Sequence, residues 1–327
     1  MSSALTALRR WCDPFIAALL VVLVIGIAIP IPHVFIEALT WAGTLAVMVL
    51  FFVYGARLRS SEVIAGLTNV RLQAGVALAT FVVFPLLGWA GHGLTASLLG
   101  GMFATGTLYL TLLPSTVQSS VTFTSIARGN VAGAVCSATI SNIAGVIVTP
   151  VLVYAIMGKA SGVDPSKILD VVLQLLLPFA VGQLLQPRIG EWVRERRWLT
   201  KGVDHGTILI VVASAVAGAT AKGLWRTVTL GQIGGLLVSS AILLALMLAA
   251  TWWGGKALSL SRADRIVLLM CGSKKSLATG LPMAAIIFPA HTLAAVTVPV
   301  IVFHQLQLVV CAWLARRLAR TTEEEPR

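Results

Sequence analysis

Ten apolar runs of about membrane-spanning length follow one another along this chain, and they constrain its fold more than any other feature. A helix needs about 20 apolar residues to cross the hydrocarbon core of a bilayer. Hydrophobic residues make up 57% of the chain and charged residues 11%, a composition typical of a polytopic, all-α membrane protein. We therefore expect ten transmembrane helices, at 14 to 29, 35 to 56, 72 to 90, 97 to 126, 131 to 157, 168 to 186, 203 to 221, 231 to 254, 264 to 288 and 293 to 314.

The net charge of +12 would suggest a nucleic-acid partner in a soluble protein, but here the positive residues lie between the apolar runs. With ten spans, eighteen of the 24 lysines and arginines fall on one side of the membrane. Only Lys159, Lys167, Lys222 and Arg226 fall on the other side. The positive-inside rule then predicts that both termini are cytoplasmic. We expect the protein in the plasma membrane, which is the inner membrane of a bacterium. The expected partner is the lipid bilayer, and no nucleic acid is expected.

Five runs precede the loop at 158 to 167 and five follow it. An odd number of spans in each half inverts the second half relative to the first, so we expect two inverted five-helix repeats, 1 to 158 and 159 to 327. Inverted repeats of this kind are typical of secondary transporters.

The fourth run of each half is interrupted by small, polar and proline residues. In the first half the interruptions are Thr105-Gly106-Thr107 and the segment from Leu113 to Ser120. In the second half they are Cys271 to Ser276 and Thr279 to Pro282. Unwound backbone at membrane depth is tolerated only where it lines a cavity or is buried in protein, so paired interruptions indicate a binding site. The predicted helix breaks are Pro114, Gly272, Gly280 and Pro282.

Two adjacent lysines, Lys274 and Lys275, lie near the middle of the ninth run. At 1.5 Å per residue they are roughly 13 to 20 Å from either end of the span. An ionisable residue at this depth indicates function. The alternative is that the lysines extend to an interface, but a lysine stem reaches only about 6 Å beyond its Cβ.

Neighbouring residues on a helix point about 100° apart, which predicts different roles for the two lysines. We expect Lys274 to face a substrate anion or a vacant cation position, and Lys275 to bind backbone carbonyls freed at the opposite break; the reverse assignment stays open. The twelve acidic residues all lie in loops, tails or near span ends, so the expected ligand is an anion, or the lysines replace a coupling cation. The predicted binding residues are Lys274, Lys275, Ser273, Ser276, Thr116, Gln118, Ser119, Ser120, Thr139 and Asn142.

Several of these polar residues have a simpler alternative role, because serine and threonine commonly mediate helix packing in membranes. Enzyme signatures such as HExxH, GxSxG and Walker A are absent from the sequence, and the four cysteines show no ligand spacing. We therefore expect no catalytic residues, no cofactor and no metal centre, and an intramembrane enzyme that uses an activated lysine is only a minor alternative.

The interrupted runs resemble a known family. Leu113-Pro114-Ser115-Thr116, the turn Ala127-Arg128-Gly129-Asn130 and Lys274-Lys275-Ser276-Leu277-Ala278 look like the two crossover regions of the bile acid:sodium symporter superfamily, closest to its divergent SBF-like branch. The resemblance covers all ten spans. It implies a core domain from spans 3–5 and 8–10, a panel domain from spans 1–2 and 6–7, and an elevator-like movement of the core.

The chain departs from the sodium-coupled members of that family at their sodium ligands. The position of their glutamate holds Leu269, and the position of their Gln-Asn pair holds Ser273-Lys274. In the first crossover Ser120 is kept, but Val121 replaces an asparagine. A lysine amine in place of a sodium site predicts a carrier that does not depend on sodium.

The leading hypothesis is a secondary active transporter of a small organic anion, either a carboxylate, a sulfonate or a bile-acid or steroid-like molecule, that works by alternating access. The alternative is a non-transporting, regulatory membrane protein that affects ion homeostasis. The oligomeric state is left open by the sequence.

Overall fold

The computed structural model describes residues 14–29, 31–59, 69–158, 168–223, 225 and 228–321, and within these ranges it contains helices and no strand. Lys159, Lys167 and Arg226, which carry part of the predicted charge asymmetry, and both chain ends lie outside the described residues. Seven helical segments are long and apolar enough to cross a membrane, so the chain is a multi-pass membrane protein. These segments are Val34–Arg57, Val70–Leu99, Val131–Met157, Val172–Glu195, Arg197–Ala221, Leu230–Ala257 and Thr292–Arg320.

The other three predicted spans have a different form. The first is the apolar helix α2 (Pro14–Ala28), which has 15 residues. Each of the two interrupted spans consists of two short helices, α7 (Gly101–Thr111) with α8 (Gln118–Ile126), and α13 (Arg262–Gly272) with α14 (Leu277–Ile287). Each of the two interrupted spans therefore contains one helix break, at one of the two interruptions expected there.

α10 (Ile168–Glu195) and α11 (Arg197–Ala221) are both longer than predicted, so several charged residues expected in the loop between them lie in helices. α10 continues through Pro187, where the sequence predicts its end, and α11 begins directly after Arg196. A proline inside a helix removes one backbone hydrogen bond. α10 packs along α3 (His33–Arg57) more extensively than any other helix pair, and this packing stabilises the helix beyond its proline.

The third predicted span is one continuous helical segment made of α5 (Val70–Leu78), the π-helical turn η1 (Ala79–Val83) and α6 (Phe84–Leu99). A π-turn disturbs the regular i to i−4 hydrogen bonds and often marks a functional position. The remaining elements are α9 (Val131–Leu152) with η2 (Val153–Met157), α12 (Leu230–Ala257) and α15 (Ala290–Thr321).

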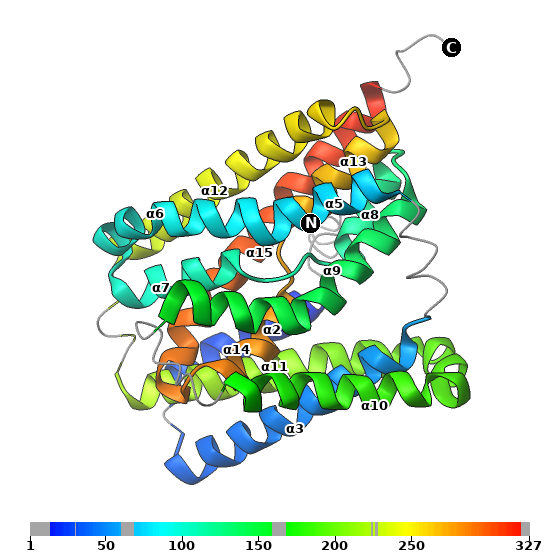
Figure 1. Ribbon diagram of the computed structural model, residues 1–327. Helices are drawn as coiled ribbons and strands as arrows, with labels where there is room; N and C mark the ends of the chain where they lie inside the picture. Colours follow the sequence, from blue (N-terminus) through cyan, green and yellow to red (C-terminus); the bar gives the residue numbers. More distant parts are fainter. Residues whose placement is uncertain are drawn as a thin grey trace, which may run out of the picture.

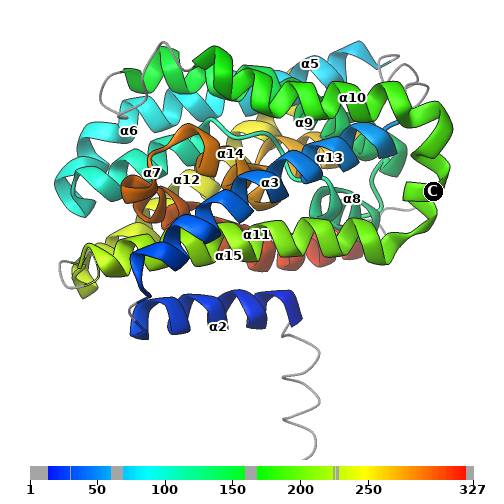
Figure 2. The same ribbon diagram turned by 90° about the horizontal axis from the view of Figure 1, so that it is seen from below.

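The helices form two groups in space. α3, α10 and α11 lie side by side, and α2 packs against α11 at the outer edge (Figures 1 and 2). The second group contains α5 to α9, α12, α13 and α15 (Figure 1). α14 contacts α3, α10, α11 and α15, so the half-helix after the second break lies between the two groups.

The backbones of α3 and α10 approach unusually closely at two glycines. A Cβ atom on Gly55 would overlap the carbonyl oxygen of Phe179, and a Cβ atom on Gly182 would overlap the carbonyl oxygen of Phe52. Small residues allow such close backbone packing between membrane helices. These two glycines therefore fix how the first group of helices is assembled.

Candidate functional site

The two helix breaks contact each other in the interior. The first unwound segment runs from 112 to 117 and the second from 273 to 276. The Ser276 amide donates to the Pro114 carbonyl (2.9 Å), and the Ser115 hydroxyl donates to the Cys271 carbonyl (2.5 Å). We call this contact between the two unwound segments the crossing. It satisfies backbone groups that have lost their helical partners, which is required at membrane depth.

α9 and α15 supply further partners for the unwound backbone. Asn142 donates to the Ser115 carbonyl (2.7 Å), and the Ser141 hydroxyl accepts from the Ser115 amide (3.0 Å). On the other side, the Gln307 side chain accepts from the Lys275 amide (2.9 Å) and donates to the Lys275 carbonyl (2.8 Å). A side-chain amide that binds both groups of one residue replaces the partners that a continuous helix would provide.

Two of the predicted break positions are wrong, and so is the first interruption proposed in the first half. α14 runs without a break through Gly280 and Pro282, and α7 runs through Thr105, Gly106 and Thr107. Gly106 instead permits close packing, because a Cβ there would meet the Ala295 carbonyl oxygen of α15. The correct positions are Pro114, within the first unwound segment, and Gly272, the last residue of α13.

Lys275 is buried, and its side chain holds three elements together. Its Nζ atom donates to the Leu113 carbonyl in the first break (2.6 Å) and to the Thr80 carbonyl in the π-turn (2.8 Å). The same atom lies 4.3 Å from the ring centroid of Phe84, within the range of a cation–π contact. The Lys275 side chain therefore binds one backbone carbonyl of the opposite break, as expected, and one of the π-turn.

Lys274 is also completely buried, but its surroundings differ. Its Nζ atom lies 4.5 Å from the ring centroid of Phe123 and has no hydrogen-bond partner in the described part of the chain. The prediction that this lysine faces the cavity differs from the structure: neither Lys274 nor Lys275 lines it. The two lysines do have different surroundings, as expected, but both are buried rather than exposed to the cavity.

A cavity of about 960 Å³ lies beside the crossing. One wall consists of residues from α8, α9, α14 and α15, and the other of residues from α2, α3, α10 and α11. This volume lies near the upper end of the range for small-molecule sites. Among the described residues, no group of three or more histidine, cysteine or acidic side chains could hold a metal ion.

The predicted binding residues divide into two sets. The residues that line the cavity are Thr116, Gln118, Ser119, Thr139, Asn142 and Ser276. Those that do not are Ser120, Ser273, Lys274 and Lys275, all buried within the crossing itself. Ser120 donates to the Met270 carbonyl (3.0 Å) and Ser273 to the Leu269 carbonyl (2.5 Å). These two serines support the unwound backbone rather than the cavity wall.

Both half-helices that follow a break begin at the cavity. The lining includes Gln118 and Ser119 from the first turn of α8, and Leu277 and Thr279 from the first turn of α14. The N-terminus of a helix carries free amide groups and a partial positive charge. The two half-helix N-termini thus make this part of the cavity suited to a negatively charged group.

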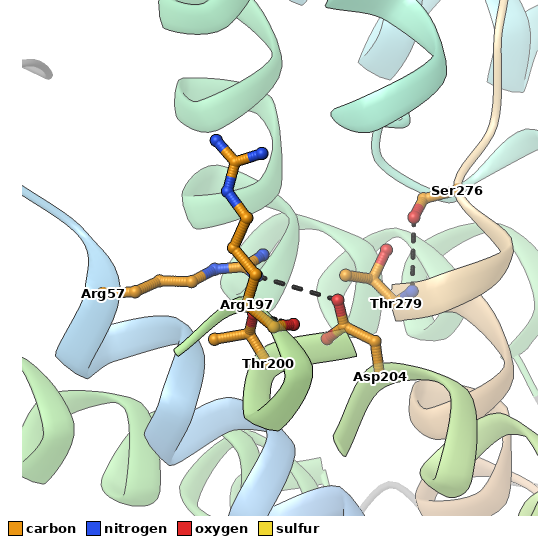
Figure 3. A network of polar contacts seen from close by, with 6 residues as sticks. All are labelled: Arg57, Arg197, Thr200, Asp204, Ser276 and Thr279. Carbon is orange, nitrogen blue, oxygen red and sulfur yellow. Dashed lines mark hydrogen bonds and ion pairs between the residues drawn. The ribbon is translucent and has the colours of Figure 1, made fainter. Parts of the chain in front are cut away.

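The cavity lining also includes charged or titratable residues that are not among the predicted binding residues. They are Arg57, Arg194, Arg197, Lys201, Asp204 and His205. Arg57 and Asp204 form an ion pair (3.7 Å) between α3 and α11, and Figure 3 shows it together with Arg197 and with Ser276 and Thr279 of the crossing. The sequence signal was present, because the α11 lining positions 197, 201, 204, 205 and 208 have the spacing of one helix face.

Comparison with known proteins gives a consistent family assignment. The model of the SBF-like CPA transporter family matches residues 13–320. A protein of Escherichia coli (strain K12) named "Putative symporter YfeH" is 41% identical over 319 residues, covering 97% of this chain and 96% of the relative. A Pseudomonas aeruginosa protein, PA2026, is 40% identical (95% and 94% covered), and sodium/bile acid cotransporter 7 of Mus musculus is 26% identical (81% and 79%). The chain therefore belongs to the SBF-like CPA transporter family, as its crossover residues indicated.

Proposed function

We propose that this protein is a secondary active transporter that carries a small organic anion by alternating access. The observation that carries this proposal is the meeting of two broken helices whose following half-helices both begin at a cavity of about 960 Å³. Broken helices at the centre of the membrane are the common substrate site of secondary transporters.

The proposed topology has ten membrane crossings in two inverted repeats, 1 to 158 and 159 to 327, with both termini in the cytoplasm of a bacterial inner membrane. In this topology the seven long apolar helices, α2 and the two interrupted pairs would each span the membrane once. The group α2, α3, α10 and α11 corresponds to the proposed panel domain, and the second group with α14 to the proposed core domain.

The proposed substrate is a carboxylate, a sulfonate or a bile-acid-like anion. The half-helix N-termini favour negative charge, and arginine and lysine outnumber acidic residues in the cavity lining. The mouse relative is named as a sodium/bile acid cotransporter, which makes bile acids reasonable first probes.

We propose that transport does not require sodium. The only charged side chains in the two unwound segments are Lys274 and Lys275, so the crossing offers ammonium groups where a cation site needs oxygen ligands. The buried Lys274 ammonium has no hydrogen-bond partner in the described part of the chain, and it would take the place of the coupling ion.

Thermal denaturation of the purified protein tests this proposal. Cholate, naphthalene-2-carboxylate and naphthalene-2-sulfonate are added in sodium or potassium buffer of equal ionic strength. Saturation at about 100 times Kd stabilises a protein by about 2.7 kcal/mol, a shift of several degrees in Tm. We expect such a shift with at least one anion, equal in both buffers, and uptake of that anion into proteoliposomes without a sodium gradient.

A lysine variant completes the test. Lys274→Met removes the charge proposed to replace the coupling ion, so it should reduce the anion-dependent shift although Lys274 does not line the cavity. Lys256→Met, a change of an exposed lysine in the last turn of α12, should not. A larger shift in sodium than in potassium would contradict sodium independence. Binding without uptake in proteoliposomes would favour the alternative, a regulatory membrane protein that has kept the fold.

A further inference from the structure

The charges of the cavity lie on one wall only. Arg57 comes from α3, Arg194 from α10, and Arg197, Lys201 and Asp204 from α11. The opposite wall, from α8, α9, α14 and α15, contributes no arginine, lysine or acidic side chain to the described lining. The cavity thus has a cationic wall, which we define as Arg57, Arg194, Arg197 and Lys201, and a neutral wall.

The same helical spacing occurs on the two walls. α11 lines the cavity at positions 197, 201, 204, 205 and 208, and α9 lines it at 135, 139, 142, 143 and 146. On α11 these positions hold Arg, Lys, Asp, His and Ile, whereas on α9 they hold Val, Thr, Asn, Ile and Val. From the first to the last of these positions on α11 is about 16 Å, so the charge is concentrated toward one end of an elongated site.

The cationic wall has more positive groups than carboxylates to pair with. Asp204 is the only acidic residue in ion-pair contact with any of the four among the described residues, and it contacts Arg57 (3.7 Å). The Nη1 atom of Arg194 donates to the Arg57 carbonyl (3.3 Å), while its Nε atom is buried without a hydrogen-bond partner in the described part of the chain. A buried donor with no acceptor is costly and favours an external acceptor.

We propose that this cationic wall recognises the charged group of the substrate, and that the neutral wall accommodates the rest of the molecule. The expected ligand is an elongated, amphipathic organic anion with its carboxylate, sulfonate or sulfate at one end. This inference rests on the proposed transport function. It places recognition of the substrate's charged group on the cationic wall. The two buried lysines of the crossing do not line the cavity and leave this role to α3, α10 and α11.

Positive residues at helix ends can also contact anionic lipid instead of a substrate. Two neighbouring arginines allow these two roles to be distinguished. Arg196 immediately precedes Arg197 but does not line the cavity; its side chain stacks on Trp192, with Cζ 4.2 Å from the ring centroid. The two arginines share the same charge and the same connection between α10 and α11. Arg196 is therefore a matched control for Arg197.

The experiment measures the Kd of naphthalene-2-carboxylate, naphthalene-2-sulfonate and cholate, with naphthalene-2-carboxamide as the neutral counterpart of the first. A hydrogen bond to a charged group contributes enough that its loss should raise Kd about tenfold or more. We expect this increase in Arg194→Gln and Arg197→Gln, and less than about a twofold change in Arg196→Gln. Asp204→Asn should lower Kd, because it removes the carboxylate that competes for Arg57.

The outcomes distinguish this inference from the proposed function. An unchanged Kd in Arg194→Gln and Arg197→Gln, with anions still bound, overturns the cationic wall and leaves the transporter intact. Equal affinity for the carboxamide and the carboxylate also overturns it. Failure of the wild type to bind any of the three anions overturns both proposals. Gel filtration and Tm of each variant without ligand show whether a change in Kd comes from altered folding.

Discussion

The Nζ atom of Lys275 lies 2.6 Å from the carbonyl oxygen of Leu113, so a side chain from the second helix break completes the backbone hydrogen bonding of the first. The same atom also binds the Thr80 carbonyl (2.8 Å), which the π-turn of the third span presents to the interior. Two breaks and one irregular turn therefore share a single ammonium group. This arrangement makes the crossing one structural unit.

Lys275→Met should lower stability. The substitution leaves the Leu113 and Thr80 carbonyls buried without this donor, and each unsatisfied group costs about 1–3 kcal/mol. We expect Tm in detergent to fall by several degrees, while Lys256→Met, at an exposed position on α12, changes it little. An unchanged Tm in Lys275→Met would show that water or lipid satisfies these carbonyls.

Asp264→Ala should loosen the contacts at the start of α13, the end of this helix away from the second break. The Asp264 carboxylate accepts from the side-chain amide of Asn130 at the start of α9 (2.8 Å). It also accepts from the side-chain amide of Asn69 at the start of α5 (3.1 Å). Loss of two hydrogen bonds to a charged acceptor should cost about 3 kcal/mol or more. Faster backbone amide exchange in α5, α9 and α13 would support this, with the exposed Glu37→Ala as control. Faster exchange in α13 alone would contradict the idea that Asp264 holds the starts of α5, α9 and α13 together.

The sequence predicted most of the helices correctly because the bilayer imposes their length and apolar character. The predicted end of the sixth span at residue 186 is wrong, because packing on α3 maintains α10 through Pro187 to Glu195. The predicted interruptions at Gly106, Gly280 and Pro282 are also wrong, since the structure has helix there. Packing partners from distant segments decide these cases, and they are not visible in a local pattern.

The site was harder to predict for a related reason. Six of the predicted binding residues lie on the cavity, while Ser120 and Ser273 bind backbone carbonyls instead. The expected contact of Lys275 with a backbone carbonyl of the opposite break is confirmed, but the expected exposure of Lys274 to the cavity is not, since the residue is buried. Arg197 and Lys201 precede the predicted start of the helix at residue 203, so the sequence indicates only a role in orientation for them. Because α11 begins at Arg197, they share one helix face with Asp204 and Ile208.

Gly182→Ala and Gly202→Ala should have opposite effects on stability. Both glycines are in helices, where alanine is intrinsically more favourable by about 1 kcal/mol. At Gly202 an added Cβ meets no atom within 4 Å, but at Gly182 it overlaps the Phe52 carbonyl of α3. We expect Tm to rise slightly or stay constant in Gly202→Ala and to fall in Gly182→Ala. A fall in neither variant would show that α3 and α10 can separate without cost.

Cysteine accessibility tests whether α9 lines an open, electropositive cavity. Thr139 lies on the cavity wall, whereas Ser137, two residues earlier on the same helix, is buried and does not line it. With Cys12 and Cys136 replaced by serine, Thr139→Cys should react with hydrophilic methanethiosulfonates and Ser137→Cys should not. Reaction of the native Cys271 and Cys311 is not expected, because both are buried.

The charge of the reagent adds a second comparison at the same position. A cavity lined by Arg57, Arg194, Arg197 and Lys201 concentrates anions, so a sulfonate reagent should modify Thr139→Cys roughly tenfold faster, relative to its reaction with free cysteine, than a quaternary ammonium reagent. The preference should decrease with ionic strength, because salt screens partly exposed charges. Equal relative rates for the two reagents would mean that the cationic residues do not determine the potential at the neutral wall.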